Sequence, residues 1–410
     1  MDQLLNPYSP GAGATPVTIA GRDEQIDAFR FLLARLAKGR TAQSLIITGL
    51  RGVGKTVLLS QFRDIAFEND WVVLEIEASK HDDFQFKQQF FFKLREALFE
   101  LAPPSKWTGK LKRAASILKS FSLTINPDGG VSFGADIEPL IGKADTHELS
   151  TDLTEVFIAL GEAAKEKKRG VVLLIDELQF LSSSQLEAII AALHKTVQRN
   201  LPFTLVGAGL PQIAELAGDA KSYAERLFTF IEIGSLDESN ARKALEGPAE
   251  EEGAQFEDQA LTRAVAVTEG YPYFLQELGW SVWQQAAQSP FSEDDVTNAI
   301  PRYEAKLDSS FFRVRLDRCT ELQKAYLRAM AELGRGPQSA SDVAAVMGRE
   351  TGNVAPVRAQ LIEMGLLYTP SFGQAAYTVP QFAEFVVRAE PTLHVPEKRV
   401  RRKKSQPDAE

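Results

Sequence analysis

Eight consecutive residues fit the pattern of a phosphate-binding loop, G-x-x-x-x-G-K-[ST]. They are Gly49, Leu50, Arg51, Gly52, Val53, Gly54, Lys55 and Thr56. The apolar segment 44–48 before them predicts a buried strand, and a helix is expected after them. In this setting the loop N–H groups and the helix N-terminus face a triphosphate, Lys55 reaches its β and γ phosphates, and the Thr56 hydroxyl binds Mg²⁺. An ordinary glycine-rich turn is the less specific alternative.

The acidic pair Asp176 and Glu177 ends a second strongly apolar segment, residues 171–175. An unbroken apolar run of this kind predicts a strand buried on both faces, as in a parallel sheet covered by helices. At the end of that strand, Asp176 is placed to hold the metal, and Glu177 to polarise the water that attacks the γ-phosphate. The pair alone also fits a solvated strand end, but after a phosphate loop it predicts an ATPase site.

The composition limits the class of protein. The chain has 410 residues, 44% of them hydrophobic and 25% charged, which suits two or three globular domains. The single cysteine, Cys319, excludes an intramolecular disulfide framework and a cysteine zinc site, and the four histidines show no ligand spacing. No apolar run reaches the roughly 20 residues of a membrane span. The N-terminus lacks the basic region of a signal peptide, so a cytoplasmic protein is expected.

Charge is distributed unevenly along the chain. The net charge of −9 argues against a protein that coats nucleic acid uniformly. Residues 396–410 differ, because they combine three acidic residues with six basic ones: Lys398, Arg399, Arg401, Arg402, Lys403 and Lys404. This stretch is too polar to pack and is predicted to be a disordered tail. It either binds phosphates, with its lysines and arginines as candidate DNA contacts, or remains solvated.

Strand-like and helix-like segments alternate in the first part of the chain. The alternation predicts an α/β fold with a five-stranded parallel sheet, helices on both faces, and a ligand at the strand C-terminal ends. The expected domains are a strap and first helix at 1–42, a nucleotide-binding core at 43–235, a helical lid at 236–306, a C-terminal domain at 307–395, and the tail.

An insertion is expected within the core at about residues 102–150. Its first half is predicted to be an amphipathic helix with a basic face. That face is expected to contact DNA or a neighbouring subunit, or to be exposed to solvent only. Alternating segments at 121–125 and 131–133, separated by an Asn-Pro-Asp-Gly-Gly turn, predict a β-hairpin. Before the insertion, a helix near residues 84–98 has too many phenylalanines for one face. It is predicted to be buried rather than to stack on a cofactor.

With these motifs in order, the chain resembles the AAA+-related P-loop ATPases that include the origin-recognition initiators, the archaeal-type ATPases and the STAND switch proteins. In that group a Gly-Arg-Asp or Gly-Arg-Glu element lies beside the adenine, and it matches Gly21, Arg22 and Asp23 here. The resemblance spans nearly the whole chain. It implies ATP as the nucleotide, with Mg²⁺, and an ATPase that hydrolyses ATP to ADP and phosphate.

The resemblance also implies a role for Arg226, which precedes the fifth expected strand where AAA+ proteins carry an arginine finger. Such a finger reaches the γ-phosphate of a neighbour, so it implies a homo-oligomer; the alternative is that Arg226 caps its own helix. Two departures favour slow or partner-stimulated hydrolysis. The fourth strand ends in 207–209, Gly-Ala-Gly, without the usual polar sensor, and the lid helix begins near Pro272 rather than with a sensor arginine.

Residues from Thr320 onward have the layout of a winged helix-turn-helix, and they resemble the module appended to the initiators and archaeal-type ATPases. In a DNA-binding version, the third helix enters the major groove. Val354, Val357, Leu361 and Ile362 are its predicted buried face. The candidate DNA contacts are Arg349, Asn353, Arg358 and Gln360, the last three predicted to point outward. Basic and acidic residues are balanced in this region, and winged helices also contact proteins. A STAND-like signalling or scaffold switch with little hydrolysis is therefore the alternative function.

Overall fold

The computed structural model describes residues 1–11, 13–80, 82–126 and 137–397. These residues form two compact units, one from Met1 to Tyr303 and one beginning at Glu304. Within the described ranges, every helix is too short or too polar to cross a membrane.

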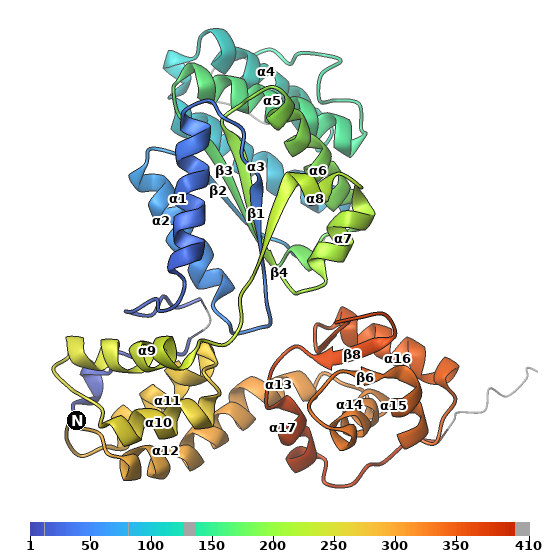
Figure 1. Cartoon of the computed structure of the whole chain (residues 1–410). Helices are drawn as coiled ribbons and strands as arrows, with labels where there is room; N and C mark the ends of the chain where they lie inside the picture. Colours follow the sequence, from blue (N-terminus) through green and yellow to red (C-terminus); the bar gives the residue numbers. More distant parts are fainter. Residues whose placement is uncertain (12, 81, 127–136, 398–410) are drawn as a thin grey trace, which may run out of the picture. The chain divides into compact units, whose positions relative to one another are not determined.

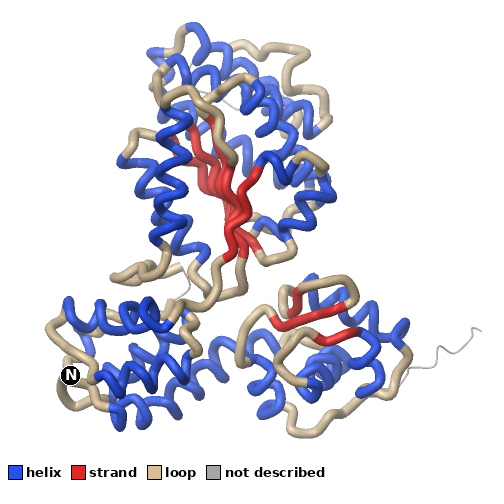
Figure 2. The backbone as a smooth tube through the Cα atoms, in the orientation of Figure 1, coloured by secondary structure: helices blue, strands red, loops and turns tan. Residues whose placement is uncertain are grey.

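The first unit is built on a sheet of five parallel strands in the order β2-β3-β4-β1-β5 (Figure 2). The strands are β1 (Ser44–Thr48), β2 (Val72–Glu77), β3 (Val171–Asp176), β4 (Phe203–Gly209) and β5 (Phe228–Glu232). Every residue of β1 and β4 is buried, as is all of β3 except its last residue. Continuous apolar runs therefore form the central strands, and the predicted α/β fold with a five-stranded parallel sheet is confirmed.

Helices cover both faces of this sheet (Figure 1). Helices α1 (Asp23–Ala37) and α2 (Lys55–Glu68) pack against each other, and α2 lies on the central strands. The remaining core helices are α3 (Asp83–Leu101), α5 (Leu149–Glu166), α6 (Ser183–Gln198), α7 (Ile213–Ala220) and α8 (Ala224–Leu227). Phe86, Phe90 and Phe91 of α3 are buried in the core as expected, while Phe84 and Phe92 are 51% and 42% exposed.

The predicted hairpin is wrong in its first strand. Helix α4 (Gly109–Leu123) includes Phe121, which is fully buried on the helix face that also buries Leu118. The buried apolar positions of the helix therefore continue into residues 121–123, the first part of the predicted strand. These residues follow the helical period and not the period of two that is typical of a strand. The turn residues 127–130 and the second predicted strand lie outside the described residues. Helix α4 packs on α3 and α5, outside the layer that covers the sheet.

Four helices, α9 (Glu238–Glu251), α10 (Asp258–Thr268), α11 (Pro272–Gln285) and α12 (Glu293–Lys306), follow the sheet and make up the region predicted to be the lid. The N-terminal strap, which starts with the short helix η1 (Gln3–Leu5), lies on these helices. The Tyr8 ring is only 2% exposed, its hydroxyl donates to the Leu245 carbonyl, and the Trp283 indole donates to the Asp2 carbonyl at 2.8 Å. The strap is thus part of the lid core.

In the second unit, the last residues of α12 are followed by a π-helical turn (Leu307–Phe312) and α13 (Arg313–Leu316). Three helices follow: α14 (Glu321–Leu333), α15 (Ala340–Val346) and α16 (Thr351–Glu363). Strands β6 (Gln338–Ser339), β7 (Leu367–Tyr368) and β8 (Gln374–Tyr377) form an antiparallel sheet in the order β6-β8-β7, and α17 (Phe382–Ala389) ends the fold. This unit resembles a winged helix, as predicted; β6 and α17 were not expected from the sequence.

Candidate nucleotide-binding site

The predicted phosphate loop joins the C-terminal end of β1 to the N-terminus of α2. Gly52 and Gly54 have φ values of 88° and 94°, in the left-handed region that side chains other than glycine rarely adopt. A Cβ at Gly49 would lie 2.3 Å from the carbonyl oxygen of Ile233, so this position also excludes a side chain. The glycines therefore permit a loop that wraps closely around the first turn of α2.

Lys55 lies at the centre of the loop and is 6% exposed. Its Nζ donates to the carbonyl oxygens of Gly49, at 2.9 Å, and Leu50, at 2.8 Å. Burial lowers the pKa of Lys55, while the nearby Glu177 and Asp176 carboxylates act in the opposite direction. The buried ammonium group is held by loop carbonyls, which a phosphate oxygen can replace.

Asp176 faces the phosphate loop from the end of β3. The Thr56 hydroxyl donates to Asp176 Oδ2 at 2.6 Å, and the Glu177 N–H donates to Oδ1 at 2.8 Å. Burial raises the pKa of Asp176, and these two hydrogen bonds oppose that shift. A hydroxyl and a carboxylate oxygen in contact are the donor set that Mg²⁺ takes in phosphate-loop sites, so Thr56 and Asp176 fit the metal.

Glu177 is positioned by an unusual backbone and by a neighbour that the sequence did not point to. It has φ 55° and ψ 40°, a left-handed conformation that is uncommon for a glutamate. The short helix η3 (Leu178–Phe180) follows, and the Gln179 amide nitrogen donates to Glu177 Oε2. The Gln179 carbonyl oxygen accepts from the Leu210 N–H, just beyond β4, at 3.0 Å. The only signal in the sequence is a glutamine two residues after the acidic pair.

Arg22 connects the segment before α1 to the phosphate loop. Its side chain is largely buried, the residue being 9% exposed, and the guanidinium donates to Val53 O at 3.1 Å and to Gly234 O, after β5, at 2.8 Å. Gly21 has a φ of 65°, and a Cβ there would lie 3.0 Å from Asn240 of α9. Gly21 and Arg22 therefore lie where the loop, the sheet edge and the lid meet.

The lid touches the phosphate loop through the start of α11, whose first residue is Pro272. The Tyr271 hydroxyl donates to Arg51 O, and the Tyr273 N–H donates to Gly52 O at 3.1 Å. A Cβ at Gly52 would lie 3.1 Å from Tyr273 Cβ and 3.2 Å from Tyr271 Cε1. A change in the loop conformation would therefore act directly on the lid.

The same backbone contact, from the Tyr273 N–H to the Gly52 carbonyl, fixes the N-terminal turn of α11 against the part of the loop that carries Arg51. The Arg51 Nε is buried and has no hydrogen-bond partner among the described residues. Arg51 therefore adds a second positive charge beside Lys55, in a place where an anion would be stabilised.

Arg226 lies at the N-terminal ends of the strands, whereas the phosphate loop lies at their C-terminal ends. It is exposed in the last turn of α8, and β5 starts two residues later, level with the start of β1. The phosphate loop follows the opposite end of β1, about 16 Å away along five strand residues at ~3.3 Å each. Arg226 therefore does not reach the phosphate loop of its own chain.

The candidate DNA contacts of the second unit are less available than the sequence predicts. Arg358 is half-buried and donates to Gln374 O at 2.6 Å and to Thr369 Oγ1 at 3.2 Å, so it holds the wing instead of pointing outward. Arg349 is half-buried and donates to Pro396 O, and Asn353 is half-buried beside Glu350. Gln360 is exposed, as predicted, although its carbonyl accepts from Gln323 at 3.0 Å.

The buried face of α16 comprises Val354, Val357 and Leu361, whereas Ile362 is only half-buried, contrary to the prediction. The exposed positions of this helix carry no lysine or arginine. They are Thr351, Gly352, Ala355, Pro356, Ala359, Gln360 and Glu363. Lys398, Arg399, Arg401 and Arg402 of the tail lie outside the described residues.

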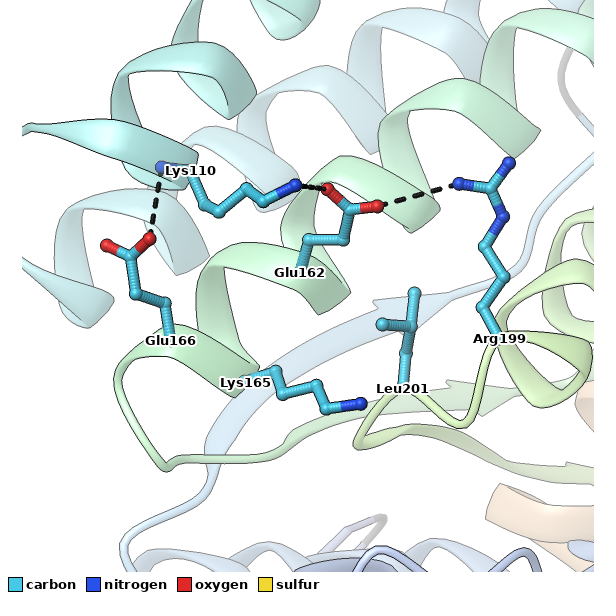
Figure 3. Close-up of a pocket in the computed structure, with 6 residues that line it drawn as sticks. All are labelled: Lys110, Glu162, Lys165, Glu166, Arg199 and Leu201. Carbon is cyan, nitrogen blue, oxygen red and sulfur yellow. Dashed lines mark hydrogen bonds and ion pairs between the residues drawn. The ribbon is translucent and has the colours of Figure 1, made fainter.

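A separate group of charged residues lines an open pocket between α4, α5 and α6 (Figure 3). Glu162 accepts from Lys110 Nζ at 2.6 Å and pairs with Arg199 at 3.5 Å, and Glu166 accepts from the Lys110 N–H at 3.2 Å. Because α5 ends here, just before β3 begins, the pocket lies near the N-terminal ends of the strands, and the phosphate loop lies at their C-terminal ends. These ion pairs attach α4 to the core and are distinct from the nucleotide site.

Comparisons with known proteins agree with this arrangement. Residues 18–206 match the AAA ATPase domain family, a range that contains Arg22, the phosphate loop and the acidic pair. Residues 309–386 match a family described as a domain of unknown function. A search of curated proteins gave no match.

Among solved structures, the chain is similar to a Walker-type ATPase of Pyrococcus abyssi, with 16% identity, a TM-score of 0.57, and coverage of 90% of this chain and 96% of that one. Cdc6p from Pyrobaculum aerophilum gives 12% identity and a TM-score of 0.46, covering 95% and 97%. The Aeropyrum pernix Orc1 protein in complex with DNA gives 14% identity and a TM-score of 0.43, covering 92% and 94%. The likeness of fold over most of the chain rests on the first of these structures.

Proposed function

We propose that this chain, which carries an AAA ATPase domain at residues 18–206, binds Mg-ATP and hydrolyses it slowly. The observation that carries the proposal is the contact between the Thr56 hydroxyl and the Asp176 carboxylate, beside the buried Lys55 ammonium group. These groups follow two different strands of the sheet, and together they supply the cation and the metal ligands that a triphosphate needs.

In this proposal each residue has a separate task. The loop N–H groups and Lys55 bind the β and γ phosphates, and Thr56 and Asp176 hold Mg²⁺, which supplies positive charge to the phosphate oxygens. Glu177 accepts a hydrogen bond from the attacking water and orients it towards the γ-phosphate. Gly21, Arg22 and Pro272 line the side of the site where the core meets the lid.

Phosphate release measured with and without Mg²⁺ tests the enzymatic part of the proposal. We expect Glu177→Gln to bind ATP with unchanged affinity and to lose at least about 100-fold in kcat, because positioned general-base groups contribute ~10²–10⁴. A Glu162→Gln variant, changed at the opposite edge of the sheet, serves as the control and should keep wild-type kcat. Wild-type turnover by Glu177→Gln would contradict the assignment.

The proposed output of this ATPase is DNA binding or assembly through the second unit, coupled to nucleotide state by the lid. The contacts of Tyr271 and Tyr273 with the phosphate loop support the coupling, because they join the loop to α11. The winged-helix layout and the basic residues of the tail support DNA as a ligand.

A second candidate function is a STAND-like switch in which the winged helix contacts protein. One observation favours it: the exposed positions of α16 are uncharged or acidic, and Arg358 is held by the wing. The loop between β7 and β8 also presents Phe372, whose side chain is fully exposed. Phosphate recognition depends on lysine and arginine, so this helix face is better suited to a protein surface than to DNA.

Filter binding of the full chain to duplex DNA, with ATP and at about 50 and 200 mM salt, separates the two functions. DNA binding through the basic residues predicts measurable affinity at low salt that falls steeply at higher salt. Absence of affinity at low salt would exclude the DNA function and leave the protein-contact function.

A further inference from the structure

We infer that Gln179 is a positioning residue for hydrolysis, one that orients the Glu177 carboxylate and connects it to the end of β4. The inference rests on the proposed function and deepens it, because it assigns the polar group that the end of β4 itself lacks. It is carried by a chain of hydrogen bonds from the Leu210 N–H to the Gln179 carbonyl and from the Gln179 amide nitrogen to Glu177.

The direction of these hydrogen bonds is fixed by chemistry. A backbone N–H can only donate, so the group of Gln179 that faces Leu210 must be its carbonyl oxygen. The NH₂ group then faces Glu177, where it donates to one carboxylate oxygen and leaves the other oxygen available to a water. Gln179 therefore selects one rotamer of the Glu177 side chain.

The end of β4 is shaped to accept η3. A Cβ at Gly207 would lie 2.2 Å from Leu178 Cδ1, and one at Gly209 would lie 3.0 Å from the Gln179 carbonyl oxygen. These two glycines face the same side of the strand, and their lack of side chains makes room for η3. The absence of side chains at Gly207 and Gly209 thus leaves the space that Leu178 and Gln179 occupy. The polar group at the end of β4 therefore comes from η3 and not from the strand.

The backbone at Glu177 needs such support. Its left-handed conformation is energetically unfavourable for a residue other than glycine. The conformation turns the chain so that η3 folds back, with the Phe180 N–H donating to Glu177 O at 2.9 Å. Glu177 is therefore held at its backbone by η3 and at its side chain by Gln179.

Steady-state ATP hydrolysis by the full chain, with ATP affinity measured separately, tests the inference with two substitutions. For Gln179→Ala we expect kcat to fall about 10- to 100-fold with unchanged ATP affinity, the usual effect of removing a group that orients a reacting side chain. Gln179→Glu keeps the shape and the acceptor for Leu210 but places an oxygen against the Glu177 carboxylate. It should lose at least as much activity, and it remains informative if the alanine variant fails to fold.

A double variant distinguishes positioning from general structural support. If Gln179 acts through Glu177, adding Gln179→Ala to Glu177→Gln should slow hydrolysis no further than Glu177→Gln alone. Gln212→Ala is the matched control, because Gln212 is also half-buried near Leu210 and its carbonyl has no hydrogen-bond partner among the described residues. It should keep wild-type kcat.

Three results would overturn the inference: unchanged kcat in both Gln179 variants, a raised kcat, or losses that multiply in the double variant. If the wild-type chain hydrolyses ATP and any of these results is found, only the role of Gln179 is contradicted, and the proposed hydrolysis stands. A wild-type chain that binds ATP and releases no phosphate contradicts the proposed hydrolysis itself, and the role of Gln179 with it.

Discussion

At the scale of single residues, Lys55 carries a positive charge in a buried position of the phosphate loop. Its ammonium group is buried and depends on the carbonyls of Gly49 and Leu50 for hydrogen bonds. We expect Lys55→Ala to weaken ATP binding about 10- to 100-fold, because a hydrogen bond to a charged group contributes roughly 1.5–3 kcal/mol. Titration with a fluorescent ATP analogue measures this loss.

The exposed Lys38, at the end of α1, provides the control for this substitution. Lys38→Ala removes the same charge from the chain while leaving the phosphate loop intact, so ATP affinity should stay at the wild-type value. If Lys55→Ala binds ATP as tightly as Lys38→Ala does, the loop does not hold the phosphates.

The sequence was sufficient to bring Thr56 and Asp176 to the same place, because each follows a strand and parallel strands end at one edge of a sheet. It was not sufficient for Gln179. The position of that side chain depends on the left-handed backbone conformation of Glu177, and a glutamate in the sequence does not predict that conformation. Arg358 shows the same limit, since its contact with Gln374 depends on how the wing folds over α16.

At the scale of elements, the contacts of the strap with α9 and α11 are expected to stabilise the lid. The Tyr8 ring is buried against Gly279 of α11, where a Cβ would lie 2.6 Å from the ring, and its hydroxyl bonds to α9. Tyr8→Ala should lower the free energy of opening of α9 and α11 by about 3–5 kcal/mol, the usual cost of a large aromatic deletion. Hydrogen exchange of amides in these helices measures the change.

Leu4, which is 93% exposed in the same strap, gives a matched control: Leu4→Ala should leave exchange in α9 and α11 unchanged. The intermediate variant Tyr8→Phe keeps the ring and removes only the donor to Leu245, so its effect should be smaller, near ~1–3 kcal/mol. Protection in Tyr8→Ala equal to that of the wild type would show that the strap does not support the lid.

Elements were predictable where one period dominates the sequence. The apolar segments 44–48 and 171–175 predict strands, and they form β1 and most of β3. Helix α4 was shortened in the prediction because residues 121–125 satisfy a period of two as well as the helical period. Packing of Phe121 against the other helices decides between the two periods, and this tertiary contact is not visible in a local pattern.

At the scale of the whole molecule, the position of Arg226 bears on whether hydrolysis depends on assembly. Because Arg226 lies at the sheet edge opposite its own phosphate loop, any effect on the γ-phosphate must come from a second copy. The alternative, a helix-capping role, is weakened by the length of α8, since four residues generate only a small helix dipole. We therefore expect the mass in solution to increase when ATP is added.

Mixing two inactive variants tests this directly. Arg226→Ala should bind ATP normally and lose about 10³-fold or more in kcat, the range expected for an arginine finger. Lys55→Ala should bind ATP only weakly but still presents an intact Arg226, so a mixture of the two should regain part of the wild-type turnover. Arg199→Ala, which loses a partly exposed arginine near the same sheet edge, should remain active alone. Failure of the mixture to recover activity, with both variants folded, would assign Arg226 to the structure of α8.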